Sequence, residues 1–323
     1  MSLNIVRFRF PKNRSNDIYW GVQSSEFALP LKEKFSELSD FLKNGKESAR
    51  IVLNDKSSEK IPLSEIEFLS PVTAPCQIFC QGQNYSEHAR ESGTDPRDRS
   101  FNLFFQKATS SLHSPVGEIR RPKGVKLLDY EIELGLVLGT SITEPVSVTW
   151  DNLHQYISGI VIGNDVSARD VQIPQGQWFK GKSYRTFCPV GPYLTLLEKD
   201  EIQSIPKLRL ILSVNGKVRQ DSVASKMIYQ PPETLSELSQ ITDLFPGDLI
   251  LTGTPSGVAM KAPSPTLQRI ARVFLKEPKL MEIFVKKQLK ISDFLKDGDV
   301  MEGRIFDPAG NLDLGSQKLV ISS

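Results

Sequence analysis

Hydrophobic residues follow two different periods along the chain, and these periods predict its secondary structure. Residues Asn4 to Phe10 and Ile51 to Leu53 alternate like short strands, and Ser36 to Asn44 has the spacing of an amphipathic helix. Prolines then punctuate a joint before the longer remainder of the chain. The pattern predicts a small N-terminal α/β domain over residues 1–72 and a second domain over residues 73–323.

Strand-like runs dominate the second domain. β-branched and aliphatic residues recur at 127–138, 159–164, 208–214 and 249–252, and turn-forming residues close each run. The Asn215-Gly216 dipeptide predicts a hairpin, since both central positions of a type I′ turn favour positive φ. The chain is therefore expected to adopt a mixed, β-rich α+β fold.

Residues 261–290 interrupt this β-rich pattern. Apolar residues there fall at helical spacing and Lys and Arg fill many of the other positions, so the segment predicts one or two inserted helices. A basic amphipathic helix can bind a membrane or a partner, but packing on the protein surface is the more common outcome.

Composition excludes several classes of protein. The 40 Lys and Arg residues are balanced by 38 Asp and Glu, so no nucleic-acid surface is expected. No stretch approaches the ~20 apolar residues that span a bilayer, and the N-terminus lacks an apolar signal region, so no membrane association is expected. Three cysteines and three scattered histidines match no common zinc pattern, which favours a reducing compartment and a cytoplasmic location.

Two glutamates share one face of an otherwise apolar strand. A period of two places Glu131 and Glu133 together, opposite Tyr130 and Ile132. Like charges this close in a partly dry setting are costly unless one is protonated, both face water, or a cation lies between them. A solvated edge strand is the simpler alternative for an isolated pair of this kind.

A third carboxylate follows the next apolar strand. Ile160 to Ile162 lead to Asn164 and Asp165, so carboxylates from two rigid strands can bind one ion. An oxygen-rich site suits Mg²⁺, Mn²⁺ or Ca²⁺ better than zinc. Alternatively, Asp165 caps the following turn and Asp170 forms an ordinary ion pair with Arg169.

A short helix after the Gly82 to Asn84 turn carries a candidate general base. His88 and Glu91 are three residues apart and lie on one helix face, where a carboxylate raises the basicity of an imidazole. Most such pairs on a polar helix are surface features without a catalytic role. The polar segment Thr94 to Ser100 is a candidate for a lid.

Two glycine-rich segments are candidates for holding an anionic ligand. Lys182 follows Gly181 with few other charges nearby, and such a lysine can point at a bound anion. The buried run 249–251 ends in Thr252 to Pro255, where backbone N–H groups and a hydroxyl can hold a carboxylate. A tight turn that needs glycine at positive φ explains this second segment equally well.

Seven motifs together resemble the fumarylacetoacetate hydrolase family. In order over about residues 78–258 they are G-x-N-Y-x-x-H-x-x-E, Phe105 to Lys107, D-Y-E-x-E, N-D-V-S-A-R-D-x-Q, G-K-S, V-N-G-x-x-R-Q and P-G-D-x-I-L-T-G-T-P-x-G-V. Each motif is weak alone, whereas their shared order is specific. The resemblance implies a β-roll or barrel with a small N-terminal domain, and a homodimer. The insertion at 261–290 is a departure, because many relatives pass quickly to the final motif.

The resemblance also implies roles for individual residues. They are the metal ligands Glu131, Glu133 and Asp165, the base pair His88 with Glu91, the substrate-polarising residues Arg169, Gln172 and Lys182, and the pocket residues Tyr85 and Thr254. Mg²⁺, or Mn²⁺ or Ca²⁺, is the expected cofactor, and a small 2-keto or 2,4-diketo acid the expected substrate.

These roles lead to a hypothesis about the reaction. A metal-dependent hydrolase would cleave the C–C bond of a 2,4-diketo acid through a metal-held enolate, with His88 activating water and Lys182 and Gln172 steadying the oxyanion. A 2-keto acid decarboxylase, hydratase or isomerase on the same site is the nearest alternative. A non-catalytic metal-binding scaffold is another, with the basic insertion as its contact surface.

Overall fold

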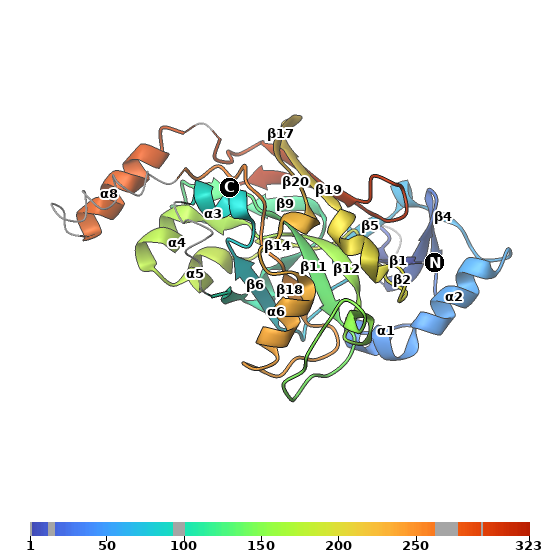
Figure 1. The fold of residues 1–323 in the computed structure, drawn as a ribbon. Helices are drawn as coiled ribbons and strands as arrows, with labels where there is room; N and C mark the ends of the chain where they lie inside the picture. Colours follow the sequence, from blue (N-terminus) through green and yellow to red (C-terminus); the bar gives the residue numbers. More distant parts are fainter. Residues whose placement is uncertain (1, 12–16, 93–100, 262–276, 292) are drawn as a thin grey trace.

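A large mixed β-sheet forms the centre of the molecule (Figure 1). The computed structural model describes residues 2–11, 17–92, 101–261, 277–291 and 293–323. In sheet order the strands are β4 (Ile61–Pro62), β3 (Phe27–Pro30), β2 (Ile18–Ser24), β1 (Leu3–Arg9), β15 (Tyr193–Leu196), β12 (Ile157–Asn164), β11 (Ile132–Leu138), β18 (Leu249–Leu251), β6 (Ile78–Gly82) and β7 (Leu103–Lys107), with β5 (Glu67–Leu69) beside β1.

A second, five-stranded sheet packs against the first. Its strands, in order, are β17 (Lys217–Val223), β16 (Arg209–Val214), β19 (Val300–Phe306), β20 (Asp313–Ser322) and β9 (Val116–Arg120). Two short pairs complete the strands, β10 (Leu128–Asp129) with β13 (Ser167–Ala168) and β8 (Leu112–His113) with β14 (Cys188–Pro189). The β-rich α+β fold that the sequence predicts is confirmed.

Helices lie around these sheets (Figure 1). They are α1 (Leu38–Asn44), α2 (Lys46–Asn54), α3 (Ser86–Glu91), α4 (Arg169–Gln175), α5 (Trp178–Lys182), α6 (Pro231–Leu238) and α8 (Glu277–Gln288). Short 3₁₀ turns are η1 (Leu63–Glu65), η3 (Thr109–Ser111), η4 (Leu153–Gln155), η5 (Ile202–Lys207) and η6 (Ala224–Lys226). Within the described ranges, no helix is long and apolar enough to cross a membrane.

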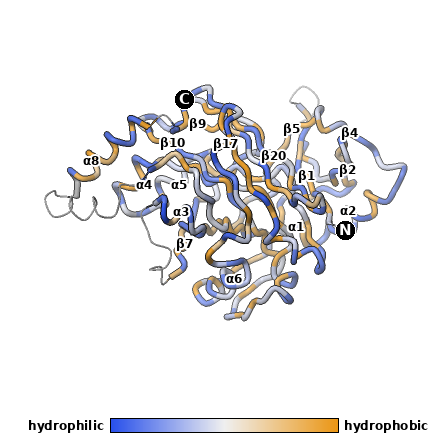
Figure 2. The backbone as a smooth tube through the Cα atoms, turned by 45° about the horizontal axis from the view of Figure 1, so that its top comes forward, coloured by the Kyte–Doolittle hydropathy of each residue, from blue (hydrophilic) through white to orange (hydrophobic). Residues whose placement is uncertain are grey.

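The central strands are apolar on both faces because both faces are covered. Leu134 and Leu136 of β11 join the core between the two sheets, whereas Val137 joins a second core that includes Trp20 and Phe41. Figure 2 shows hydrophobic residues along the inner strands and hydrophilic residues along α2. A continuous apolar run is typical of strands buried on both sides. These strands provide a rigid support for the residues at their ends.

The N-terminal strands extend the central sheet. Leu3 and Ile5 of β1 pair with Leu196 and Leu194 of β15. Trp20 stacks on Phe41 of α1 with 4.9 Å between ring centroids, so this helix covers the sheet locally. The predicted division into residues 1–72 and 73–323 remains a prediction.

Several predicted elements are confirmed. Strands occupy β1, β12, β16 and β18, and α1 lies within the predicted helical stretch. The Asn215-Gly216 turn joins β16 to β17, with φ of 51° at Asn215 and 76° at Gly216. Both values lie in the left-handed region that the sequence pattern required.

The strand predicted for Ile51 to Leu53 is wrong, because these residues lie in helix α2. Ala49, Val52 and Leu53 face the core at helical spacing, while Ile51 is 60% exposed. The 3.6-residue period over Lys46–Asn54 therefore outweighs the weak strand preference of Ile51 and Val52.

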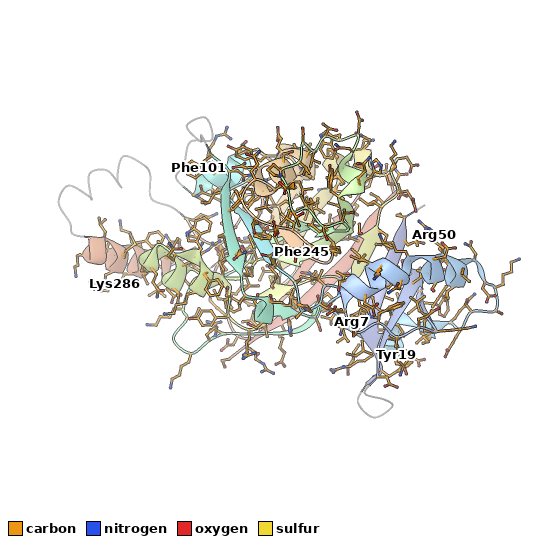
Figure 3. The ribbon with its side chains drawn as sticks, turned by 90° about the horizontal axis from the view of Figure 1, so that it is seen from below. Arg7, Tyr19, Arg50, Phe101, Phe245 and Lys286 are labelled. Atoms are coloured by element: carbon orange, nitrogen blue, oxygen red, sulfur yellow. The ribbon has the colours of Figure 1, made fainter. Side chains whose placement is uncertain are left out.

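The insertion forms at least one helix. Residues Glu277–Gln288 make α8, which lies beside α4 and extends from one end of the molecule (Figure 1). Figure 3 places Lys286 of α8 and Arg50 of α2 at opposite ends. Residues 262–276, which belong to the same predicted insertion, and the candidate lid Thr94 to Ser100 lie outside the described residues.

Candidate active site

Three buried carboxylates meet where β11 and β12 run side by side. Glu133 lies on β11, and Glu131 is the residue immediately before this strand. Asp165 is the residue immediately after β12. The backbone N–H of Asp165 donates to the carbonyl of Glu131 at 2.8 Å, which joins the two ends. One oxygen from each carboxylate lies within 4.8 Å of the others. The structure therefore brings together the three residues that the resemblance implied as metal ligands.

The continuous strand predicted over 127–138 is broken at Tyr130 and Glu131. Side chains replace the missing strand partner there: Asn164 Oδ1 accepts from the Glu131 N–H at 3.1 Å, and Gln220 Oε1 from the Ile132 N–H at 3.0 Å. Asp129 Oδ1 accepts from the Tyr130 N–H at 2.9 Å. Because these acceptors satisfy the backbone locally, the chain can leave the sheet without unpaired buried groups.

Two buried lysines contact the carboxylates directly. Lys182 Nζ lies 2.6 Å from Glu131 Oε2 and 2.5 Å from Asp165 Oδ2. Lys107 Nζ lies 2.5 Å from the other oxygen of Asp165. Lys182 belongs to the predicted site. Lys107 is part of the motif Phe105 to Lys107, but the sequence analysis assigned it no role. A lysine at the end of β7 can be placed at the site only once the neighbouring strands are known.

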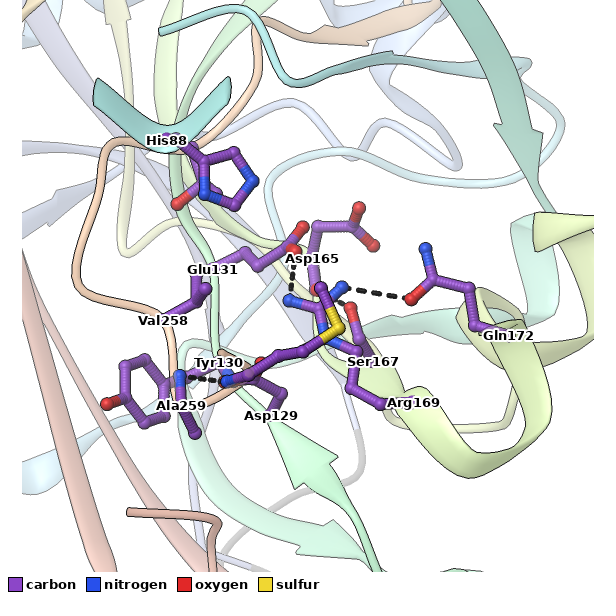
Figure 4. Close-up of polar contacts among 12 residues, drawn as sticks. His88, Asp129, Tyr130, Glu131, Asp165, Ser167, Arg169, Gln172, Val258 and Ala259 are labelled. Carbon is purple, nitrogen blue, oxygen red and sulfur yellow. Dashed lines mark hydrogen bonds and ion pairs between the residues drawn. The ribbon is translucent and has the colours of Figure 1, made fainter. Parts of the chain in front are cut away.

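Arg169 orients the site by binding several protein groups (Figure 4). Its guanidinium contacts Glu131, donates to Asp129 Oδ2 at 2.8 Å and donates to Gln172 Oε1 at 2.9 Å. The alternative ion pair with Asp170 is wrong, because Asp170 instead accepts from the Lys126 N–H at 2.7 Å. The side-chain carbonyl of Gln172 accepts from Arg169, so the side-chain N–H groups of Gln172 remain as donors.

Asp129 is a site residue that the sequence analysis did not single out. Besides Arg169, it accepts from the N–H groups of Ala259 and Met260 at 2.8 and 3.1 Å. Its place beside Tyr130 and Glu131 in the D-Y-E-x-E motif was the available signal. Asp129 therefore binds both Arg169 and the backbone at Ala259 and Met260.

Negative charge exceeds positive charge in the buried part of the site. Asp129, Glu131, Glu133 and Asp165 face three buried cations, Lys107, Arg169 and Lys182. Burial alone would raise the pKa of Glu131, but Arg169 and Lys182 outweigh burial and lower it to about 2. Burial and the neighbouring Asp165 and Glu131 carboxylates raise the pKa of Glu133 well above its usual value. Burial would lower the pKa of Lys182, but Asp165 and Glu131 raise it.

His88 and Glu91 lie on α3, and Figure 4 shows His88 above Glu131 and Asp165. The two side chains approach to 3.7 Å between His88 Nδ1 and Glu91 Oε2, which is an ion-pair distance and too long for a hydrogen bond. Burial would raise the pKa of Glu91, but His88, Lys261 and the Gly257 N–H lower it to about 2. Glu91 is therefore a charged group beside a buried imidazole.

A small cavity of about 100 Å³ opens onto this arrangement. His88, Glu131, Glu133, Arg169, Gln172, Lys182 and Thr254 all line it, together with Phe105, Trp178 and Met260 and other neighbours. Asp165, Glu91 and Tyr85 are not among the residues that line the cavity. Asp165 contacts Lys182 and Glu91 approaches His88, both of which line it. The cavity bounded by the described residues is well below the volume of drug-sized pockets, which suits a small ligand.

The segment Thr252 to Pro255 binds a carboxylate of the protein itself. The Gly253 N–H donates to Glu133 Oε2 at 2.8 Å, and Gly253 has φ +87°. The Thr254 hydroxyl donates to the Ile132 carbonyl at 2.9 Å and accepts from Gln220 at 2.8 Å. Gly253 therefore has the positive φ that the second interpretation required, and its N–H fixes a carboxylate of the protein; binding of an anionic ligand by this segment stays a prediction.

The donor set fits a divalent cation with oxygen ligands. Three carboxylates converge without a sulfur or imidazole in the group, which suits Mg²⁺, Mn²⁺ or Ca²⁺. Burial, together with repulsion from the Asp165 and Glu131 carboxylates, raises the pKa of Glu133. A cation between them would remove that repulsion.

The fold and the site together define a β-rich α+β protein whose buried carboxylate centre suits a divalent cation. Residues 77–318 match the family described as "Fumarylacetoacetate (FAA) hydrolase C-terminal", and the chain belongs to this family. The family resemblance inferred from the seven motifs is confirmed.

Named relatives carry out different reactions. The mitochondrial oxaloacetate tautomerase Fahd2a of Rattus norvegicus is 37% identical over 201 residues, which are 62% of either chain. The match thus spans less than two thirds of that protein. A fumarylacetoacetate hydrolase from Exiguobacterium antarcticum shares 26% identity, with a TM-score of 0.74 over 99% of both chains. A probable 2-hydroxyhepta-2,4-diene-1,7-dioate isomerase from Mycobacterium abscessus shares 25% identity, with a TM-score of 0.72 over 99% of this chain and 98% of that one.

Proposed function

We propose that this protein catalyses keto–enol tautomerisation of a small 2-keto acid, with a divalent cation as cofactor. One observation carries the proposal: a cavity of about 100 Å³ in which one imidazole, one ammonium group and two carboxylates of the buried triad, Glu131 and Glu133, face the same space. Tautomerisation needs one group that moves a proton at carbon and others that stabilise charge on the neighbouring oxygen. The site offers both.

Glu131, Glu133 and Asp165 are the residues that would hold the cation. When bound there, a divalent ion would supply Lewis acidity that lowers the energy of negative charge on the oxygen of a 2-keto acid. Mg²⁺ is the expected ion, with Mn²⁺ or Ca²⁺ as alternatives. The buried cations around the triad keep its carboxylates oriented.

The remaining residues have distinct tasks. His88 moves the proton at C3 of the substrate, because its ring borders the cavity on the side of Glu131. The Lys182 ammonium and the Gln172 amide donate to the oxygen on C2, where negative charge develops. Arg169 and Asp129 orient these groups through their hydrogen bonds.

Two observations favour tautomerisation over cleavage. Cleavage of a 2,4-diketo acid needs room for an attacking water beside the substrate, whereas tautomerisation needs only the substrate in the cavity. The rat relative with 37% identity is named an oxaloacetate tautomerase. We therefore favour a four-carbon 2-keto dicarboxylic acid as the substrate class.

C–C hydrolysis of a 2,4-diketo acid is the second candidate. The His88–Glu91 pair favours it, because a carboxylate beside an imidazole is typical of groups that activate water. The structure from Exiguobacterium antarcticum that is named a hydrolase has the same fold. The homodimer implied by the family resemblance also stays a prediction.

A substrate panel separates these reactions. We expect the protein with Mg²⁺ or Mn²⁺ to convert the enol of oxaloacetate to its keto form, seen as loss of enol absorbance without release of pyruvate or CO₂. Exchange of the C3 protons with ²H₂O should accelerate in parallel. Formation of two acids from an acylpyruvate would establish the hydrolase instead, and release of CO₂ a decarboxylase. If the protein bound metal to saturation but turned over no 2-keto acid, the non-catalytic metal-binding scaffold would be the remaining alternative.

A further inference from the structure

The chain segment Gly257 to Lys261, called the 257–261 segment below, holds both oxygens of Glu91. The Gly257 N–H donates to Glu91 Oε2 at 2.9 Å, and Lys261 Nζ donates to Glu91 Oε1 at 2.6 Å. Gly257 has φ +103°, and a Cβ there would lie 1.9 Å from the Arg219 carbonyl oxygen. The start of the segment is therefore fixed. The first and last residues of the segment, Gly257 and Lys261, both bind Glu91.

The same segment also contacts the metal-binding side of the site. The N–H groups of Ala259 and Met260 both donate to Asp129, which binds Arg169 (Figure 4). The Met260 side chain lines the cavity. The 257–261 segment thus connects the helix that carries His88 to the network that orients Glu131.

The inserted helix α8 holds the end of this segment. Gln288, the last residue of α8, is 4% exposed. Its amide nitrogen donates to the Lys261 carbonyl at 2.6 Å, and its amide oxygen accepts from the Lys261 N–H at 3.1 Å. Both backbone groups of Lys261 are therefore bound by a single buried side chain from the insertion.

Energetics indicate that this backbone contact matters more than the ion pair. The Lys261 side chain is 46% exposed, and an exposed ion pair contributes little to stability because solvent screens it. A buried amide that loses its partners leaves unpaired polar groups, which is more costly than the loss of an exposed ion pair. Gln288 therefore fixes the backbone from which the Lys261 side chain reaches Glu91.

We propose that α8, through Gln288 and Lys261, positions Glu91 and with it His88, so that the insertion is a working part of the active site. Lys261 is then a positioning residue that acts through Glu91 and α3. The effect of Lys261 and Gln288 on turnover rests on the proposed function.

Variants at Lys261 and Gln288 test this inference. Lys261→Ala should lower kcat by about tenfold with KM within about twofold, because a base displaced by a fraction of an ångström loses rate more than affinity. Lys261→Arg should restore most of the loss, since it can still reach Glu91. Gln288→Leu should reproduce the defect of Lys261→Ala. Lys287→Gln, an exposed position on α8, is the matched control and should match the wild-type rate.

Hydrogen exchange gives a readout that does not depend on activity. In Gln288→Leu and Lys261→Ala, the amides of Ala89 in α3 and of Ser92, which caps its C-terminus, should exchange faster, while the affinity for Mn²⁺ measured by calorimetry stays unchanged. An unchanged exchange rate in both variants would overturn the inference, as would faster exchange with an unchanged kcat. If no 2-keto acid is turned over, the proposed function fails, and the exchange rates of the Ala, Arg and Leu variants alone decide whether the insertion positions α3.

Discussion

Replacing Glu133 by Gln is expected to abolish tight binding of Mn²⁺ and Mg²⁺ while leaving the protein folded. Glu133 is the member of the triad whose only hydrogen bond within the described residues comes from a backbone group, the Gly253 N–H. Glu131 and Asp165 each contact buried cations, so their removal would leave those cations unpaired and destabilise the fold. Gln keeps the volume and the acceptor for Gly253, and it removes only the charge.

The expected loss is large for metal binding and for turnover. Removing one of three charged ligands should weaken the affinity for Mn²⁺ by more than about 100-fold, since even changes behind the ligands cost 10–100-fold. Turnover should fall by about 10³-fold, because the cation contributes several kcal/mol to stabilising charge. Calorimetric titration with Mn²⁺ and steady-state assays at saturating Mn²⁺ measure the two effects.

Stability should change in the opposite direction. A carboxyl whose pKa is raised on folding costs stability above its unfolded pKa, because the unfolded chain prefers the ionised form. The raised pKa of Glu133 therefore makes the wild type less stable in chelator as pH rises, and Glu133→Gln should lack this dependence. Glu87→Gln removes an exposed carboxylate from α3 and is the matched control. Unchanged Mn²⁺ affinity in Glu133→Gln would contradict the assignment of the triad.

Local patterns predicted the parts of the site that depend on strand ends. A buried strand followed by Asp165, and a neighbouring strand with glutamates at alternate positions, were enough to place three carboxylates together, because antiparallel neighbours bring such ends into register. The same reasoning located β12 and β18 and the Asn215-Gly216 hairpin. These features depend on periods of two and on turn chemistry, both of which a sequence displays directly.

Features that depend on distant partners could not be predicted in this way. The break at Tyr130 and Glu131 exists because Asn164 and Gln220 supply acceptors from other strands. Lys107 reaches Asp165 only because β6 and β7 extend the sheet beyond β18. The position of α2 was missed for a different reason: a short apolar run fits both periods, and burial on one face decided between them.

Arg169 has contacts that the sequence could not show. Its guanidinium binds Asp129, Glu131 and Gln172. An arginine with several bound partners is a rigid support for the groups that it orients. Arg169 also lines the cavity beside Lys182 and Gln172, and the role in holding the substrate that the family resemblance implies stays a prediction.

His88→Gln is expected to lower kcat by about 10²- to 10⁴-fold, the usual contribution of a positioned acid–base group. His88 is 5% exposed and borders the cavity beside Glu131, and Glu91 gives it a charged neighbour at 3.7 Å. Gln cannot exchange a proton near neutral pH, although it retains polarity and similar length. Rates of enol conversion and of C3 proton exchange in ²H₂O should fall together, because the same group moves the proton in both measurements.

The affinity for Mn²⁺ distinguishes loss of this proton transfer from damage to the site. His88 is not part of the carboxylate group, so the calorimetric Mn²⁺ affinity of His88→Gln should stay within a few-fold of wild type. His154→Gln removes an imidazole from η4, outside the residues that line the cavity, and should leave both rate and affinity unchanged. If His88→Gln kept its rate of C3 exchange, another titratable group that lines the cavity, either the Lys182 ammonium or a carboxyl group such as that of Glu133, would have to move the proton.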